Sequence, residues 1–323
     1  MTFHVLIPDR LAPEGIEVLE TAGFQVTAGS LSRDEVLAAL SDVDALIVRS
    51  ATQVDAELLA AAPRLKAIAR AGAGVDNIDL EAAGTRGIPV MNTPGGNTIA
   101  AAEHTFGLML ALARHIPQGH QSLLEGRWDR KRFMGTELRG KTLGIIGLGR
   151  IGKAVARRAQ AFEMRTVAYD PKLETSVEVE GTVVVPLEKL LAESDYILLH
   201  APANESTVDL INPETIARMK DGVRIINTAR GVLIDAHALA EAIKLGKVAG
   251  AAIDVYPEEP PPDDYPLIGL EGVVHTPHLG ASTAEAQITV AVQAAEQIRD
   301  GLLHGDFRNV CNAAALHSMA TGD

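Results

Sequence analysis

The sequence has 323 residues, of which 47% are hydrophobic, and a formal net charge of −13 at pH 7. This length predicts two domains of ordinary size, and the apolar fraction is too high for an intrinsically disordered chain. The negative charge disfavours binding to nucleic acid or to an anionic membrane surface, because both require a basic face on the protein.

The cysteine count and the N-terminal residues indicate the compartment. The single cysteine, Cys311, excludes an intrachain disulfide and fits a reducing environment. No basic stretch followed by an apolar run opens the chain, so no signal peptide is predicted. No apolar run reaches the ~18 residues that a membrane helix needs. We therefore expect a cytoplasmic protein that does not enter the membrane.

The first hundred residues alternate short apolar runs with helical patterns. The predicted strands are Phe3–Ile7, Ala45–Arg49, Leu65–Ala69 and Pro89–Asn92. The helical patterns are Pro13–Ala22, Ser32–Leu40 and Asp55–Ala61, and Ser32 with Glu35 fits a capping box. This β–α alternation predicts a parallel sheet with helices on both faces.

Two segments of different character follow. A mostly apolar helical pattern runs from about Thr98 to Ile116 and is expected to end before Pro117. Its composition suggests a connector that packs between two bodies. The stretch Trp128–Leu138 is charged, aromatic and aperiodic, which suits an extended arm.

A second α/β run begins at Thr142. Its predicted strands are Thr142–Ile146, Thr166–Tyr169, Tyr196–Leu199, Arg224–Asn227, Gly250–Val255 and Val273–Thr276. Helices are predicted to start near Arg150, Leu187, Pro213 and Ala236, and a last helix covers Thr283–Leu303. The tail His317–Asp323 has no periodicity and is expected to fray.

These patterns predict an α/β protein with two doubly wound parallel-sheet domains around a cleft. The final helix pattern suggests that the chain returns to its first domain. We expect a substrate-binding domain at 1–96 plus 285–323 and a nucleotide-binding domain at 97–284.

A glycine motif directly follows the strand Thr142–Ile146. Gly147, Gly149 and Gly152 form G-x-G-x-x-G between a strand and a helix, the context that dinucleotide binding requires. The first glycine permits a tight turn, the second lets the backbone approach a pyrophosphate, and the third allows close packing of helix on sheet. The anion would then lie at a helix N-terminus.

An acidic residue stands at the expected distance from this motif. Asp170 ends the next predicted strand, where a carboxylate accepts hydrogen bonds from the ribose hydroxyls and repels a 2′-phosphate. This pattern predicts NAD as the cofactor. Lys172 is close in sequence and leaves NADP open as an alternative.

Three further residues follow predicted strand ends, where ligands bind in open α/β sheets. Arg230, Glu259 and His278 each have an ordinary structural interpretation when taken alone. Together they form a chemical set, because an imidazole can take a hydroxyl proton, a carboxylate can orient that imidazole, and a guanidinium can bind a substrate carboxylate. The predicted reaction is hydride transfer between NAD and a 2-hydroxy acid.

These stretches resemble the D-isomer-specific 2-hydroxyacid dehydrogenases over nearly the whole chain. The resemblance rests on Gly147–Gly152, Asp170, Ala229–Gly231, Glu259–Pro261 and His278–Ser282. Within that family, the phosphoglycerate dehydrogenases are the most similar, through Val48–Thr52, Arg70–Asn77, Val90–Pro94 and Arg132–Leu138.

The resemblance implies an activity and roles for residues. The implied reaction is NAD-dependent oxidation of D-3-phosphoglycerate to 3-phosphohydroxypyruvate, a step of serine biosynthesis. His278 would be the acid/base, Glu259 would orient it, and Arg230 would bind substrate. The residues implied to line the cofactor, beside the three glycines and Asp170, are Arg150, Ile151, Thr228, Ala229, Asp254 and Gly280. Those implied to bind substrate from the first domain are Arg49, Ser50, Arg70, Gly72 and Gly74.

The resemblance also bears on assembly. It implies a homodimer, formed through the nucleotide domain, or a higher homo-oligomer. The basic run Arg130–Lys131–Arg132 is a candidate to reach across to a neighbouring subunit. Many phosphoglycerate dehydrogenases carry further C-terminal regulatory domains. The sequence stops soon after its last long helix, so we expect a short form without serine feedback through such domains.

Two alternatives stay open. A hydroxypyruvate or glyoxylate reductase would share every catalytic residue. An NADH-sensing corepressor of the carboxy-terminal-binding-protein type would share the fold and similar site residues. A formate dehydrogenase is disfavoured because such enzymes have glutamine where Glu259 stands. His200 is more simply a structural histidine than a cofactor contact, and neither His104 nor His275 has metal-site spacing, so no metal is expected.

Overall fold

The computed structural model describes the backbone of residues 2–321 and the side chains of residues 2–317. Contacts divide the chain into two compact units. One contains the residues up to Asn97 together with those from Ser282 onward, and the other is Thr98–Ala281. The predicted breaks lay one residue before the first of these boundaries and three residues after the second.

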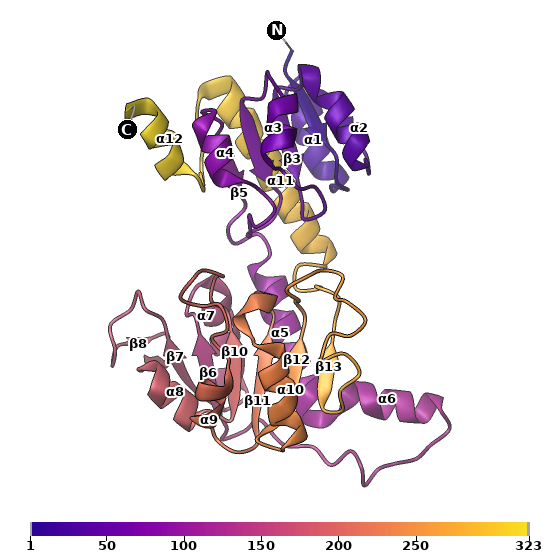
Figure 1. Ribbon diagram of the computed structural model, residues 1–323, viewed down its shortest axis with the longest axis vertical. Helices are drawn as coiled ribbons and strands as arrows, with labels where there is room; N and C mark the ends of the chain where they lie inside the picture. The colour runs from indigo at the N-terminus through magenta and orange to yellow at the C-terminus, as the bar shows by residue number, and fades with distance from the viewer. Residues whose placement is uncertain (1, 322–323) are drawn as a thin grey trace. The chain divides into compact units, whose positions relative to one another are not determined.

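The first unit is built on a five-stranded parallel sheet with the order β2-β1-β3-β4-β5 (Figure 1). Its strands are β1 (His4–Ile7), β2 (Gln25–Ala28), β3 (Ala45–Val48), β4 (Ala67–Arg70) and β5 (Val90–Asn92). Its helices are α1 (Pro13–Thr21), α2 (Arg33–Ala39), the 3₁₀ turn η1 (Leu40–Asp42), α3 (Ala56–Ala61), α4 (Leu80–Thr85), α11 (Ala284–His304) and α12 (Ala313–Thr321).

Helices cover both faces of this sheet. Leu19 of α1 and Ile298 of α11 are fully buried on one face, and Val36 of α2 and Leu58 of α3 are buried on the other. Gly15 allows α1 and α11 to pack closely, because a Cβ there would lie 2.8 Å from the carbonyl oxygen of Ala291. The long helix near the end of the chain therefore completes the core of the first unit.

The second unit contains an eight-stranded sheet with the order β13-β12-β11-β10-β6-β7-β9-β8. The strands are β6 (Thr142–Ile146), β7 (Arg165–Tyr169), β8 (Glu178–Val179), β9 (Thr182–Val184), β10 (Tyr196–Leu199), β11 (Val223–Asn227), β12 (Val248–Ile253) and β13 (Val273–His275). All neighbours pair in parallel except β8 and β9, which form an antiparallel edge.

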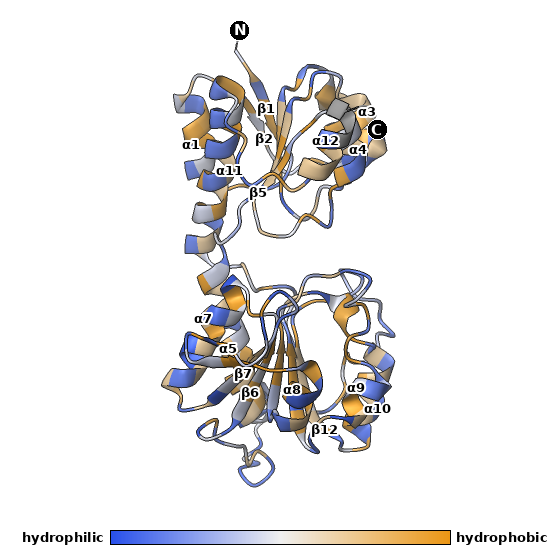
Figure 2. Ribbon diagram, turned by 90° about the vertical axis from the view of Figure 1, so that its left-hand side faces the viewer, coloured by the Kyte–Doolittle hydropathy of each residue, from blue (hydrophilic) through white to orange (hydrophobic). Residues whose placement is uncertain are grey.

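Helices also cover both faces of the second sheet. They are α5 (Thr98–Arg114), α6 (Ile116–Leu124), α7 (Arg150–Ala161), α8 (Leu187–Glu193), α9 (Pro213–Ala217), the 3₁₀ turn η2 (Gly231–Leu233) and α10 (Ala236–Lys244). Apolar residues of α5 and α7 pack on one face, and those of α8, α9 and α10 pack on the other. In Figure 2 strands β6 and β12 are largely apolar, whereas α10 and α11 show both colours, as helices with one buried face should.

The structure confirms the α/β class with parallel sheets and corrects several local predictions. The connector helix does not run to Ile116 as predicted. It ends at Arg114, His115 adopts a left-handed backbone with φ +54°, and Pro117 lies in the first turn of a new helix, α6. Proline is well tolerated there because the first amides of a helix have no intrahelical acceptor.

The tail prediction is also wrong where it can be checked. The segment expected to fray, from His317, is helical to Thr321 within α12, which packs against α4 (Figure 1). Residues 322 and 323 of that prediction lie outside the described part of the chain. Within residues 2–321 no helix is long and apolar enough to cross a membrane.

Candidate active site and cofactor site

The turn after β6 has the geometry of a dinucleotide site. Gly147 has φ +97°, and a Cβ there would lie only 2.6 Å from the carbonyl oxygen of His200. A Cβ at Gly152 would overlap the carbonyl oxygen of Gly147, so this glycine lets α7 pack against the turn. A Cβ at Gly149, the N-cap of α7, would point into open space. The backbone at the helix N-terminus is thus accessible to an anion.

The topology of the sheet exposes this turn. Strand β6 has β7 on one side and β10 on the other, so the order of the strands reverses between β6 and β10. Ligands bind at such a switch point, beyond the carboxyl ends of the strands. His200 follows β10 at this place, and burial lowers its pKa to about 4, so its imidazole is neutral at pH 7. Arg150 and Ile151 form the first turn of α7 above the glycines.

Asp170 follows β7 and touches the glycine turn. Its Oδ2 accepts a hydrogen bond from the Leu148 amide at 3.0 Å, and its Oδ1 accepts one from the Lys172 amide at 3.0 Å. Each carboxylate oxygen has a second lone pair, so Asp170 can still accept ribose hydroxyls. The residues of this edge therefore fit NAD: an anion-accepting helix N-terminus beside a carboxylate acceptor.

Asn227 shapes the turn that carries Arg230. Its buried side chain accepts from the Ala229 amide at 3.0 Å and donates to the carbonyl of Arg230 at 2.8 Å. The next residue, Gly231, makes room for the backbone of Tyr256, which precedes the Glu259 loop. The turns after β11 and β12 therefore pack against one another.

His278 and Glu259 form a direct pair. Nδ1 of His278 lies 2.6 Å from Oε2 of Glu259, while Oε1 of Glu259 accepts from the Tyr256 amide at 3.1 Å. A carboxylate is only an acceptor, so Nδ1 carries the proton and the lone pair of a neutral imidazole lies on Nε2. The side chains are 47% and 38% exposed, so the pair is accessible to a substrate. This arrangement can take up and return a proton at Nε2.

Asp254 holds the loop of His278 through hydrogen bonds to its backbone. The fully buried carboxylate accepts from the amides of Leu279 at 2.7 Å and Gly280 at 3.0 Å and from the Thr276 hydroxyl at 2.6 Å. The backbone carbonyl of Asp254 accepts from the His278 amide at 2.8 Å. Burial raises the pKa of Asp254, but the donors, His104 first among them, outweigh burial and hold it below the usual range. Asp254 is therefore ionised at neutral pH.

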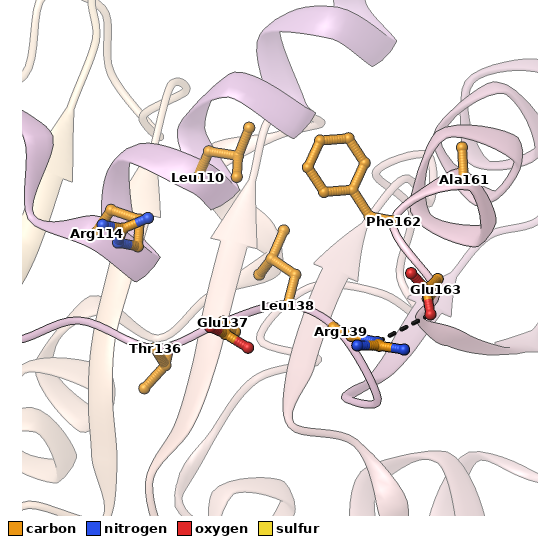
Figure 3. A pocket seen from close by; sticks show the side chains of 9 residues that line it. All are labelled: Leu110, Arg114, Thr136, Glu137, Leu138, Arg139, Ala161, Phe162 and Glu163. Carbon is orange, nitrogen blue, oxygen red and sulfur yellow. Dashed lines mark hydrogen bonds and ion pairs between the residues drawn. The ribbon is translucent and has the colours of Figure 1, made fainter.

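His278 and Glu259 line a cavity of about 440 Å³. Its lining is mainly apolar, with Tyr256, Pro260, Pro261 and Ile268 beside the two histidines His275 and His278. Another cavity of about 390 Å³ lies at the far ends of α5 and α7, between Leu110, Leu138 and Phe162, with the Arg139–Glu163 ion pair at its rim (Figure 3). None of the predicted site residues lines that second cavity.

The predicted substrate residues of the first unit follow its central strands. The half-buried Arg49 follows β3, where its Nη1 donates to the Arg10 carbonyl at 3.3 Å. Arg70 ends β4, and its guanidinium occupies the space that a Cβ on Gly72 would need. Glycine at 72 is thus what allows this position of Arg70. Ser50 is exposed beside Arg49, and Gly74 is half-buried two residues beyond Gly72.

The sequence analysis missed the contribution of α5. Nε2 of His104 lies 3.0 Å from Oδ1 of Asp254 and 3.1 Å from the hydroxyl of Thr276. The hydroxyl of the next residue, Thr105, lies 2.7 Å from that of Thr228. The sequence signal that could have predicted this contribution is the pair of adjacent polar residues, His104 and Thr105, on a mostly apolar helix. Among the residues the structure describes, no group of three or more His, Cys, Asp or Glu side chains is arranged to hold a metal ion.

The chain is similar to known proteins along most of its length. Residues 106–280 match the family D-isomer specific 2-hydroxyacid dehydrogenase, NAD binding domain. The chain is 49% identical over 314 residues to a D-3-phosphoglycerate dehydrogenase of Archaeoglobus fulgidus, covering 97% of this chain and 60% of that protein. It is 50% identical over 300 residues to a hydroxypyruvate reductase of Thermotoga maritima, covering 92% and 97%.

The solved structures similar to this chain include that of a glyoxylate reductase from Paecilomyes thermophila. Its TM-score is 0.86 and its sequence identity 32%, and the match covers 96% of this chain and 98% of that one. The chain belongs to the D-isomer-specific 2-hydroxyacid dehydrogenase family, and its second unit holds the family's NAD-binding domain. It spans about 60% of the length of the curated phosphoglycerate dehydrogenases that it matches.

Proposed function

We propose that this protein catalyses the NAD-dependent oxidation of D-3-phosphoglycerate to 3-phosphohydroxypyruvate. The single observation that carries the reaction type is the His278–Glu259 pair, held at 2.6 Å at a strand end of a dinucleotide-binding unit. The identity of 49% with a D-3-phosphoglycerate dehydrogenase supports the choice of substrate.

In the proposed mechanism the protein moves a proton and orients the substrate. NAD, when bound, supplies the acceptor for the hydride that leaves C2. Nε2 of His278 takes the proton of the C2 hydroxyl, and Glu259 stabilises the imidazolium through its bond to Nδ1. Arg230 binds the substrate carboxylate by a charge-assisted hydrogen bond. In the reverse direction His278 returns the proton to the forming alkoxide oxygen.

The first unit is proposed to supply substrate choice. Arg49, which follows β3, and Arg70, which ends the neighbouring strand β4, are the cations we assign to the anionic groups of the substrate. In a chain with a net charge of −13, local cations are needed to accept a substrate that carries both a carboxylate and a phosphate.

A second candidate function is the reduction of hydroxypyruvate. The observation that favours it is the 50% identity with a hydroxypyruvate reductase over 97% of that protein's length. Both candidates use the same acid/base pair, so the distinction lies in the phosphate. The two candidate functions are therefore distinguished by comparing activity on phosphorylated and unphosphorylated substrates, in both the oxidised and the reduced form.

The experiment measures kcat/KM for phosphoglycerate and glycerate with NAD, and for phosphohydroxypyruvate, hydroxypyruvate and glyoxylate with NADH. The proposal expects the phosphorylated pair to be preferred by at least ten-fold. A preference for hydroxypyruvate would overturn the substrate assignment. Tight binding of NADH without turnover on any substrate would overturn the enzymatic proposal and favour a cofactor-sensing binding protein.

The proposed reaction is cytoplasmic and carried out by a homodimer. Support for the dimer comes from large apolar side chains on α6 and on the segment 128–134: Leu123 is 57% exposed, Leu124 69%, Trp128 74% and Met134 82%. Large apolar side chains left exposed so near one another in the chain favour an association surface in this segment. In sedimentation at micromolar concentration, we expect the wild type to be a dimer and Leu124→Arg to be a monomer. A monomeric wild type would contradict the proposal.

A further inference from the structure

Helix α5 carries a histidine that faces the catalytic loop from within the second unit. His104 is partly buried, with a side chain 21% exposed, and its Nε2 lies within hydrogen-bond distance of Oδ1 of Asp254 and of the Thr276 hydroxyl. The Thr276 hydroxyl itself donates to Asp254 at 2.6 Å. Because Asp254 is ionised and accepts only, Nε2 of His104 must be a donor, shared between the carboxylate and the hydroxyl.

The acceptor of this bond holds the backbone around the acid/base. Asp254 receives the amides of Leu279 and Gly280, the two residues directly after His278. His278 has φ +53°, a left-handed conformation that is uncommon for a residue with a side chain. Such a conformation persists only where its surroundings fix it, and here the bonds to Asp254 do so.

The geometry points to His104 as a positioning residue for His278. The inference, which rests on the proposed function, is that His104 fixes the rotamer of the buried Asp254 carboxylate. That carboxylate in turn fixes the amides of Leu279 and Gly280 and so the direction of the His278 ring. In the contacts described above His104 touches neither His278 nor Glu259. Its effect on that pair passes through Asp254, to which its other partner, the Thr276 hydroxyl, is itself hydrogen-bonded.

The neighbouring contact on α5 supports this role. Thr105 binds Thr228 at 2.7 Å, so consecutive residues of one helix hold the turn after β11 and the loop after β13. The helix is 17 residues long, and both Ala102 and Phe106 are buried in the core beside it. A helix so anchored is a rigid base, and rigid support keeps acid/base geometry within the narrow range that catalysis needs.

The test compares His104→Leu with His104→Gln, whose amide can donate to Asp254 as the imidazole does. The matched control is His237→Leu, the same change at an exposed histidine of α10. We expect His104→Leu to lower kcat by ten- to a hundred-fold with the substrate KM changed by less than three-fold, and His104→Gln to recover most of the loss. Equal losses in both His104 variants, or an unchanged kcat in His104→Leu, would overturn the inference.

A cycle with Asp254→Asn shows whether the effect passes through the carboxylate. In that background His104→Leu should cost less than about two-fold, because the acceptor it positions has already been altered. A full additional loss would mean that His104 acts by another route.

A readout that needs no turnover is amide hydrogen exchange. Exchange in the peptide spanning 276–283 should be at least ten-fold faster in His104→Leu than in wild type, with the β6–α7 peptide unchanged. Unchanged exchange at 276–283 would overturn the positioning role. Because exchange is measured on the full chain without substrate, its outcome is distinguishable from a failure of the proposed dehydrogenase function.

Discussion

In both units the first strand lies in the interior of the sheet and pairs in parallel with a strand on each side. Strand β1 lies between β2 and β3, and β6 lies between β7 and β10. The amino ends of these strands also match. Asp44, just before β3, accepts a hydrogen bond from the His4 amide at 3.0 Å, and Asp195, just before β10, accepts one from the Thr142 amide at 2.7 Å.

The two units differ in the turn that follows this interior strand. After β6 come Gly147, which leaves room for the His200 carbonyl, and Gly149, whose missing side chain leaves the helix N-terminus open. After β1 comes Asp9, which lies almost buried and accepts from the Arg49 amide and, at 2.8 Å, from the Thr52 hydroxyl. A carboxylate at this place repels a pyrophosphate. Two sheets with the same arrangement around the first strand thus differ in whether the turn after that strand can accept an anion.

The largest effect is expected from replacing His278, the proposed acid/base of the second unit. His278→Gln should lower turnover by ~10²–10⁴-fold, the usual contribution of general acid–base catalysis. NADH affinity should stay within about two-fold, because the glycine turn is untouched. Steady-state kinetics and fluorescence titration with NADH measure the two effects. Turnover within a few-fold of wild type would remove His278 from the mechanism.

A substitution in the glycine turn should affect the cofactor instead. Gly147→Ala forces a Cβ to 2.6 Å from the His200 carbonyl oxygen at φ +97°. We expect the Kd for NADH to rise by ten-fold or more, because the turn has to move to relieve this contact and the turn is the part of the site that would receive the pyrophosphate. The control is Gly246→Ala, at φ +78° with no atom within 4 Å of the added Cβ. Equal NADH affinities in the two variants would refute the role of the turn.

Arg49→Ala sharpens the contribution of the first unit. Loss of a charge-assisted contact to phosphate is worth ~1.5–3 kcal/mol, or roughly ten- to a hundred-fold in kcat/KM for phosphoglycerate. Glycerate should be affected far less. Arg33→Ala, which removes an exposed arginine paired with Asp55, is the control. An equal loss on both substrates would show that Arg49 is structural or binds only the carboxylate.

The smallest effect, on stability, is expected for the two equivalent aspartates that precede β3 and β10, Asp44 and Asp195. Burial raises the pKa of Asp44 and Asp195, but hydrogen bonds and cations outweigh burial and leave both lowered. Their stabilisation is therefore present above the unfolded pKa of about 3.9 and is lost as pH falls through the lower folded values. Asp44 is 1% exposed and Asp195 29%, so Asp44→Asn should cost more.

Urea unfolding measures this difference. We expect about 1–3 kcal/mol for Asp44→Asn and less for Asp195→Asn at pH 7. The differences from wild type should shrink below about pH 3.9. A difference from wild type that grows on acidification would contradict the sign of the pKa shifts.

The sequence was sufficient for the elements that have strong local signals. The strands Thr142–Ile146 and Tyr196–Leu199 were predicted with the observed bounds, because long β-branched and leucine-rich runs end at clear turn residues. The capping box of Ser32 and Glu35 is present as predicted. The edge strands β2 and β8 were missed, since their exposed residues show no apolar run.

Long-range contacts account for the rest. The break at His115 depends on a single left-handed residue, which has no glycine or asparagine to announce it. The role of His104 depends on contacts with residues 150 and 172 positions away. The pairing of His278 with Glu259 could be predicted only as a chemical set, whereas its distance of 2.6 Å needed the structure.

We propose that the two units divide the work: the second holds NAD and the acid/base, and the first selects the substrate anion. The most direct test measures NADH affinity and the ratio of kcat/KM for phosphoglycerate over glycerate in both Gly147→Ala and Arg49→Ala. The account predicts that Gly147→Ala weakens NADH and keeps the ratio, while Arg49→Ala keeps NADH affinity and lowers the ratio at least ten-fold. Loss of NADH affinity in Arg49→Ala with an unchanged ratio would contradict it.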